Sequence, residues 1–127
     1  MSFRWVSKKT VLSIHNEQLA QHGGLAGVRD EGLLESALAR PQNLSGYENA
    51  SLAKCAAANA FGIVRNHPFN DGNKRTGFVT ALTFLLLNNH YITAAESEVV
   101  LIVSRLAEGN LNEDGLAEWF ASVLCKV

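Results

Sequence analysis

The chain has 127 residues, of which 47% are hydrophobic and 18% are charged, and its formal net charge is −1. This length favours a single domain over residues 1–127, and the composition excludes an intrinsically disordered chain. Because there is no basic excess, we do not expect direct DNA binding.

The first part of the chain predicts two helices. Ser7 is a suitable N-cap for a helix that stops at Gly23-Gly24. Asp30 is a suitable N-cap for a short second helix. Arg40-Pro41 is expected to end this helix, because the residue before a proline is biased away from the helical conformation. Residues 41–50 would then form a polar connection.

Two apolar segments predict the central helices of the fold. Residues 51–66 are apolar on nearly all sides, and residues 74–88 carry a second run of large apolar side chains. Helices of this kind are buried. Thr93-Ala-Ala-Glu96 reads as a capping box that opens a fifth helix, which continues through Glu108 and stops at Gly109.

Asn112 can cap a sixth helix, with Glu113 and Asp114 in the first turn, where the helix dipole favours acids. Its apolar side chains are expected to face the core: Trp119, Phe120, Val123 and Leu124. Strand signals are absent apart from a short extended segment at residues 91–92. We therefore expect an all-α fold, a compact single-domain bundle of about six helices.

The apolar residues also bear on where the protein is found. The most apolar stretch, residues 78–87, is too short to span a bilayer, and residues 1–9 do not resemble a signal peptide. The two cysteines, Cys55 and Cys125, lie in apolar segments that predict buried free thiols within helices. We expect a cytoplasmic protein with no membrane partner.

The segment HPFNDGNKRT, residues 67–76, joins the two central helices and concentrates polar chemistry in one loop. Core packing at both ends would preorganise this loop. Gly72-Asn73 opens the following helix, where unpaired backbone N–H groups and the helix dipole favour an anion. Lys74 and Arg75 add cations at a helix N-terminus, which is unfavourable unless an anion is bound there. The segment therefore predicts a phosphate site.

Two other residues of the loop could carry chemistry. Asp71 offers a hard oxygen ligand next to phosphates, which suits Mg²⁺. His67 could accept a proton from an attacking hydroxyl, because imidazole titrates near neutral pH. Phe69 is expected to point inward and fix the loop. Each residue also has an ordinary explanation as a cap, a turn or a solvated pair, so the prediction depends on their coincidence.

The loop resembles the signature of the Fic/Doc (Fido) superfamily, His-x-Phe-x-Asp/Glu-Gly/Ala-Asn-Gly/Lys-Arg. All of its specified positions match: His67, Phe69, Asp71, Gly72, Asn73, Lys74 and Arg75. A second block resembles the N-terminal half of death-on-curing (Doc) toxins of type II toxin–antitoxin systems. It comprises His15, Gly23-Gly24-Leu25-x-Gly27-x-Arg29-Asp30, Leu33-Leu34-Glu35-Ser36-Ala37 and Arg40-Pro41.

The resemblance implies a helical bundle with the loop at its centre and an enzyme that transfers a nucleotide-derived phosphoryl group to a hydroxyl of a target protein. His67 would be the catalytic base and Asp71 would hold Mg²⁺. The phosphates of ATP would be bound by Gly72, Asn73, Lys74 and Arg75. Lys74 and Arg75 would also belong to the catalytic set, with His67 and Asp71.

Two positions separate the activities known in the superfamily. Fic enzymes that transfer AMP carry a glycine in place of Lys74 and a second arginine in place of Phe78. Doc toxins carry the lysine and phosphorylate a threonine of translation elongation factor Tu. We therefore expect a Doc-type Ser/Thr protein kinase that arrests translation. The alternatives are AMP transfer by a Fic-type protein adenylyltransferase and a catalytically silent phosphate- or partner-binding module.

The resemblance also implies a partner, a small antitoxin whose C-terminal segment binds a groove on the toxin. Residues 104–109 fit the pattern of Fic autoinhibitory helices, in which a glutamate pairs with the second arginine. Phe78 replaces that arginine here. We therefore interpret Glu108-Gly109 as a helix end.

Overall fold

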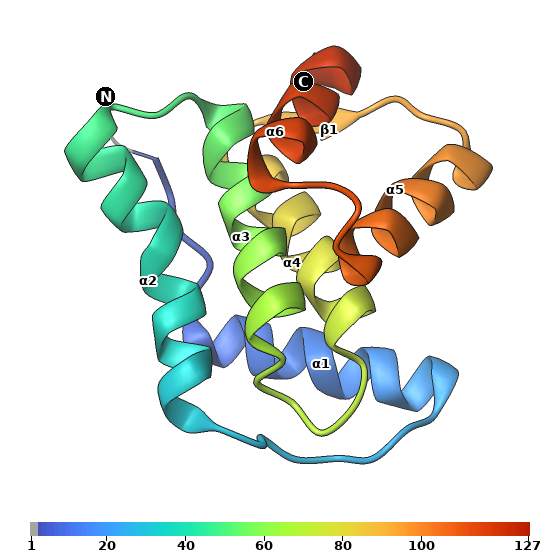
Figure 1. Cartoon of the computed structure of the whole chain (residues 1–127). Helices are drawn as coiled ribbons and strands as arrows, with labels where there is room; N and C mark the ends of the chain where they lie inside the picture. Colours follow the sequence, from blue (N-terminus) through green and yellow to red (C-terminus); the bar gives the residue numbers. More distant parts are fainter. Residues whose placement is uncertain (1–2) are drawn as a thin grey trace.

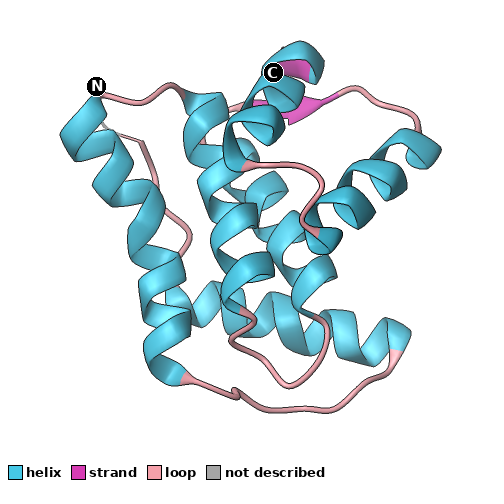
Figure 2. Cartoon of the chain, viewed as in Figure 1, coloured by secondary structure: helices cyan, strands magenta, loops and turns pink. Residues whose placement is uncertain are grey.

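Helices form most of residues 3–127, the part of the chain that the computed structural model describes. In chain order they are α1 (Lys8–His22), α2 (Glu31–Glu48), α3 (Leu52–Asn66), α4 (Asn73–Leu87), α5 (Glu96–Glu108) and α6 (Glu113–Val123). Two short strands, β1 (His90–Ile92) and β2 (Leu124–Lys126), pair antiparallel at one end of the bundle (Figures 1 and 2). The all-α prediction is confirmed.

Helix α3 lies at the centre of the bundle and packs against α2, α4 and α6 (Figure 1). Most of its residues are buried, and many of these are alanines, so neighbouring helices can approach closely. Gly62 of α3 faces the backbone of Ala37, and a Cβ there would lie 3.2 Å from the Ala37 Cα. The prediction of two buried central helices is confirmed, and these two helices flank the signature loop.

The prediction that Arg40-Pro41 ends the second helix is wrong. Helix α2 continues to Glu48 with Pro41 in its interior, so residues 41–48 are helical and form no polar connection. An interior proline costs a helix about 3 kcal/mol. Here the Pro41 side chain is buried, and Leu44 beyond it packs against the core. Tertiary packing therefore offsets the local cost.

The predicted capping box at residues 93–96 is also wrong. Helix α5 begins at Glu96 after Ala95, without a side-chain cap. Thr93 instead continues the strand pairing, since its N–H donates to the carbonyl of Val123 at 2.8 Å. Cys125 lies in β2 and is only partly buried, whereas Cys55 is fully buried in α3, where burial raises the pKa of its thiol to about 11.

The remaining predicted helix ends agree with the structure. Side chains of Ser7, Asp30 and Asn112 accept the expected N-cap hydrogen bonds, and Gly23 and Gly109 end α1 and α5. Within residues 3–127, no helix is long and apolar enough to cross a membrane.

The α1–α2 connection and the α3–α4 loop lie together at the end of the bundle opposite the two strands (Figure 1). An isolated antiparallel bridge joins Val28 of the first to Phe69 of the second. The loop that carries the predicted site is therefore supported by a segment far from it in sequence.

Candidate functional site

The loop after α3 is anchored from within by Phe69 and Asn73. The Phe69 ring is fully buried, as predicted, and stacks on the His15 ring of α1 at a centroid distance of 3.8 Å. The Asn73 side chain accepts a hydrogen bond from the Phe69 N–H and donates one to the Phe69 carbonyl, both at 2.9 Å. These contacts close the loop into a rigid turn before α4 begins.

The α1–α2 connection supports the same loop from outside. The Arg29 N–H donates to the Pro68 carbonyl at 2.6 Å, and the Asn70 N–H donates to the Gly27 carbonyl at 3.1 Å. The Arg29 guanidinium donates to the carbonyls of His67 at 2.8 Å and Asn66 at 3.1 Å. Arg29 thus holds the end of α3 and the start of the loop, and its positive charge is favourable there because a helix C-terminus carries partial negative charge.

His67 occupies the first position after α3 in the left-handed conformation, with φ 54° and ψ 52°. Its backbone is fixed by two hydrogen bonds, because the N–H donates to the Ile63 carbonyl at 3.1 Å and the carbonyl accepts from the Arg29 guanidinium. Its ring is exposed and makes no hydrogen bond within residues 3–127. A preorganised backbone with a free imidazole suits a side chain that exchanges a proton with a bound molecule.

Asp71 is exposed, and its carboxylate is oriented by two backbone groups. Its Oδ1 accepts from the Gly72 N–H at 3.0 Å, and its Oδ2 accepts from the Leu25 N–H at 3.2 Å. The described part of the chain has no group of three metal-ligating side chains. One oriented carboxylate does fit Mg²⁺ that takes its other ligands from water and phosphate oxygens, and it does not fit an all-protein metal site.

Helix α4 begins without any of the groups that usually satisfy a helix N-terminus. Gly72 precedes it in the left-handed conformation at φ 76°, with no side-chain cap and no acid in the first turn. Lys74 and Arg75 are exposed, and neither forms an ion pair with another of residues 3–127. The first N–H groups of α4 therefore remain available, beside two cations, to an anion from outside.

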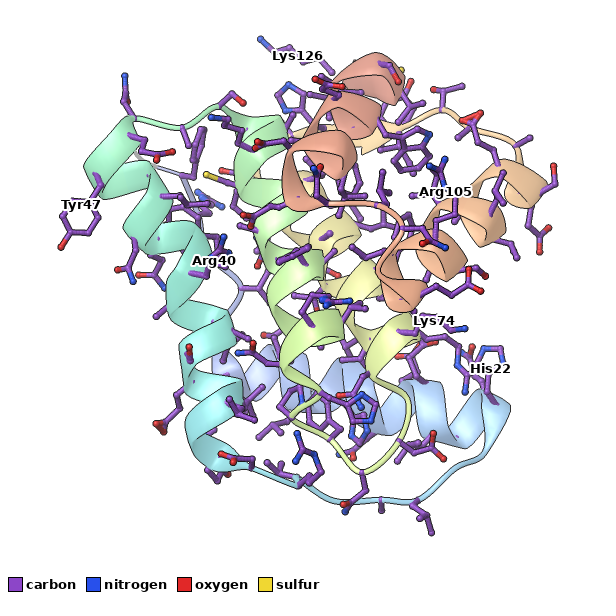
Figure 3. All side chains as sticks on the ribbon, in the orientation of Figure 1. His22, Arg40, Tyr47, Lys74, Arg105 and Lys126 are labelled. Atoms are coloured by element: carbon purple, nitrogen blue, oxygen red, sulfur yellow. The ribbon has the colours of Figure 1, made fainter. Side chains whose placement is uncertain are left out.

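All of the predicted site residues meet at one cleft of about 290 Å³. Its lining consists of Val64, His67, Asp71, Gly72, Asn73, Lys74, Arg75 and Ala107. Figure 3 shows Lys74 near the C-terminal turn of α5, the helix that contributes Ala107. Because the Asn73 side chain is committed to Phe69, its backbone N–H is the group best placed to contact a ligand.

The model of the Fic/DOC family matches residues 5–85. The chain belongs to this family. It is similar to protein kinase doc of Escherichia phage P1, with 35% identity over 86 residues that cover 67% of this chain and 68% of that protein. It is also similar to toxin Doc of Mycolicibacterium smegmatis, with 43% identity over 76 residues that cover 57% of each chain. The family expected from the signature loop is confirmed.

Phe78 distinguishes this Fic/DOC site from the pattern expected for AMP transfer. Its side chain is 6% exposed and packs at 6.0 Å from the Phe120 ring and 6.1 Å from the Trp119 ring. It does not line the cleft of the signature loop. Position 78 therefore belongs to the contact between α4 and α6, and it supplies no second guanidinium to the cleft.

Sequence reasoning assigned no role to three groups that shape the site of this Fic/DOC protein: His15, Arg29 and the N–H of Leu25. His15 and Arg29 had entered only as part of the resemblance to Doc toxins. For His15 a signal was present, because it shares one face of α1 with Val11, and both residues are buried. The contacts of Arg29 and Leu25 depend on tertiary structure.

Proposed function

We propose that this protein is a Doc-like toxin that transfers the γ-phosphoryl group of ATP to a Ser or Thr hydroxyl of a target protein. We propose translation elongation factor Tu as the target, so that the modification arrests translation in the cytoplasm. The observation that carries the proposal is the start of α4. Lys74 occupies the position at which AMP-transferring relatives have glycine, and Phe78 does not line the cleft.

The phosphates of ATP would bind at the start of α4. The backbone N–H groups of Asn73, Lys74 and Arg75 point out of the helix N-terminus, and the two side chains add positive charge. Asp71 would hold Mg²⁺, which when bound neutralises charge on the phosphate oxygens. Such positioning and charge neutralisation supply most of the catalysis in phosphoryl transfer.

His67 would act as the general base. In this step the imidazole takes the proton of the target hydroxyl as the hydroxyl oxygen forms a bond to the γ-phosphorus. The bond from the γ-phosphorus to its bridging oxygen breaks, and ADP leaves with that oxygen. The fixed backbone of His67 would keep the ring at the cleft while the exposed side chain reaches the incoming hydroxyl.

An antitoxin segment has a suitable place beside this cleft. An apolar groove of about 310 Å³ between α4 and α5 is lined largely by Phe78, Val79, Val99, Val100 and Val103, and it shares Lys74 and Arg75 with the phosphate cleft. A segment with apolar side chains in this groove and an acid at its edge would cover both cations. We propose this groove for the C-terminal segment of the antitoxin.

Two neighbouring residues of α5, a valine and a leucine, provide a test of antitoxin binding in this groove. Val100 lines the groove and is 60% exposed, whereas Leu101 is 57% exposed and lies outside it. We expect Val100→Asp to weaken antitoxin binding at least about tenfold, and Leu101→Asp to leave it unchanged. Both variants should still fold. Equal effects of the two substitutions would remove the groove from the proposal.

The proposed activity is tested with ATP labelled at the α-phosphate or at the γ-phosphate, incubated with Mg²⁺ and elongation factor Tu. We expect only the γ-label on the target, and a rate at least about 100-fold lower for His67→Ala, because a general base typically contributes that much. His22→Ala, an exposed histidine of α1, is the control and should retain full activity. Transfer of the α-label would establish AMP transfer instead. Binding of a partner without transfer of either label would support the silent binding module.

A further inference from the structure

His15 is a buried histidine to which the proposed reaction assigns no task. It lies in α1, is 2% exposed, and donates from Nε2 to the carbonyl oxygen of Asp71 at 2.8 Å. We propose that His15 is a positioning residue, which fixes the turn between Asp71 and Gly72 and thereby the groups that face the cleft. The catalytic part of this proposal rests on the proposed function, whereas its structural part does not.

The hydrogen bond fixes more than one atom, because a peptide unit is planar. Asp71 contributes the carbonyl and Gly72 the N–H of the same peptide. His15 donates to the oxygen of this peptide. The Gly72 N–H of the same peptide donates to the Asp71 carboxylate at 3.0 Å. Holding the oxygen therefore sets the direction of the N–H and, through it, the orientation of the carboxylate at the cleft.

The face of the His15 ring makes a second contact with the loop, at Phe69. This ring is stacked on Phe69 with an interplanar angle of 9°, so one side chain contacts the loop at both Phe69 and Asp71. Gly72 also lies against this ring, since a Cβ there would be 3.6 Å from its Cδ2. The start of α4 is thus supported directly by α1.

The chemistry of the pair explains why a histidine stands at this position. A carbonyl oxygen only accepts hydrogen bonds, so Nε2 must carry the hydrogen. An apolar ring of similar size would preserve the stacking and the packing but would leave the Asp71 carbonyl without this donor. A purely structural role therefore requires only the ring, whereas a positioning role requires the donor as well.

Three variants separate these two roles. His15→Phe keeps an aromatic ring and removes the donor. His15→Gln keeps a donor, because its amide nitrogen lies as many bonds from the backbone as Nε2, and removes the ring. His22→Phe makes the same substitution at an exposed position of the same helix. Thermal unfolding shows which variants are folded under the conditions of the other measurements.

Amide hydrogen exchange at Gly72, whose N–H is bonded to the Asp71 carboxylate, measures the turn without requiring any activity. We expect exchange about fivefold to tenfold faster in His15→Phe, as for loss of one hydrogen bond, and near-normal exchange in His15→Gln and His22→Phe. If the wild-type protein transfers phosphate, kcat should fall about tenfold to 100-fold in His15→Phe with KM for the target unchanged, because small displacements of reacting groups are costly.

The outcomes distinguish this proposal from the proposed function. Folded His15→Phe protein with wild-type exchange at Gly72 would overturn the positioning role, whatever the activity. Faster exchange in a protein that transfers nothing would support the positioning role and contradict only the kinase proposal. Failure of His15→Gln to restore exchange towards the wild-type rate would show that the ring, and not the donor, holds the turn.

Discussion

The starts of α4 and α6 differ in how their unpaired backbone N–H groups are satisfied. Both helices expose N–H groups that need partners. At α6, the Asn112 side chain accepts from the Gly115 N–H at 2.7 Å, and Glu113 and Asp114 occupy the first turn. The start of α4 has no side-chain cap and no acid, and it has two cations that form no ion pair within residues 3–127.

The difference separates a helix start that is satisfied by the protein's own side chains from one whose cap and cations have no partner side chain within residues 3–127. Glu113 of α6 also forms a bidentate ion pair with Arg40, so charges at this end are balanced inside the protein. The charges at the start of α4 lower stability in the absence of a ligand, and an anion from outside would balance them. A charge substitution at the start of α4 should therefore weaken nucleotide binding and leave stability nearly unchanged. One at the start of α6 should lower stability and leave nucleotide binding unchanged.

The largest expected effect comes from Phe78, whose ring packs α4 against Trp119 and Phe120 of α6. Phe78→Ala should lower the free energy of unfolding by about 3–5 kcal/mol, the usual cost of truncating a buried phenylalanine. Its ring lies 6.0 Å from that of Phe120. Urea denaturation measures the loss. A change below about 1 kcal/mol would show that the two helices do not depend on this contact.

Reversing a charge at the start of α4 should harm binding while sparing stability. We expect Arg75→Glu to weaken the binding of Mg-ATP about 100-fold, since a charged hydrogen bond is replaced by repulsion. The free energy of unfolding should stay equal or rise by about 0.3–1 kcal/mol, because acids are favoured there. Calorimetric titration and urea denaturation give the two values.

The matched control for this change is Lys9→Glu, at an exposed lysine in the first turn of α1. This substitution places the same charge at a comparable position of another helix, so it should have the same small effect on stability and none on nucleotide binding. If Lys9→Glu weakened binding as much as Arg75→Glu, net charge and not the α4 site would explain the result.

Removing the acid at the start of α6 should give the reverse pattern and the smallest effect. Glu113→Gln leaves the Arg40 guanidinium without its carboxylate, and we expect the free energy of unfolding to fall by about 1 kcal/mol. Nucleotide binding should be unchanged. The same two measurements apply, and weaker binding of Mg-ATP in this variant would contradict the division of roles between the helix starts.

The features that could be predicted from the sequence are those set by neighbouring residues. Caps such as Ser7 and Asp30, the two buried central helices and the signature loop depend on local patterns, and the structure confirms them. The predictions failed where distant contacts decide. Helix α2 continues past Pro41 because Pro41 itself is buried and Leu44 packs against the core, and Thr93 pairs with the segment before β2 instead of capping α5.

The site shows the same division. The cleft residues of the loop are contiguous in sequence, so they could be predicted together. His15 acts across 56 positions of the chain and Arg29 across 38, and no local pattern indicates what either side chain contacts. The sequence shows that Phe78 replaces the second arginine of AMP-transferring Fic enzymes. Only the structure shows that this side chain packs against α6.

The most direct test of the comparison is a titration of the protein with Mg-ATP followed by backbone amide NMR. The account predicts that the amide signals of Asn73, Lys74 and Arg75 move during the titration, while those of Glu113 and Asp114 at the start of α6 stay in place. Movement at α6 equal to that at α4, or no movement at α4 with nucleotide in large excess, would contradict the assignment of the α4 start as the phosphate site.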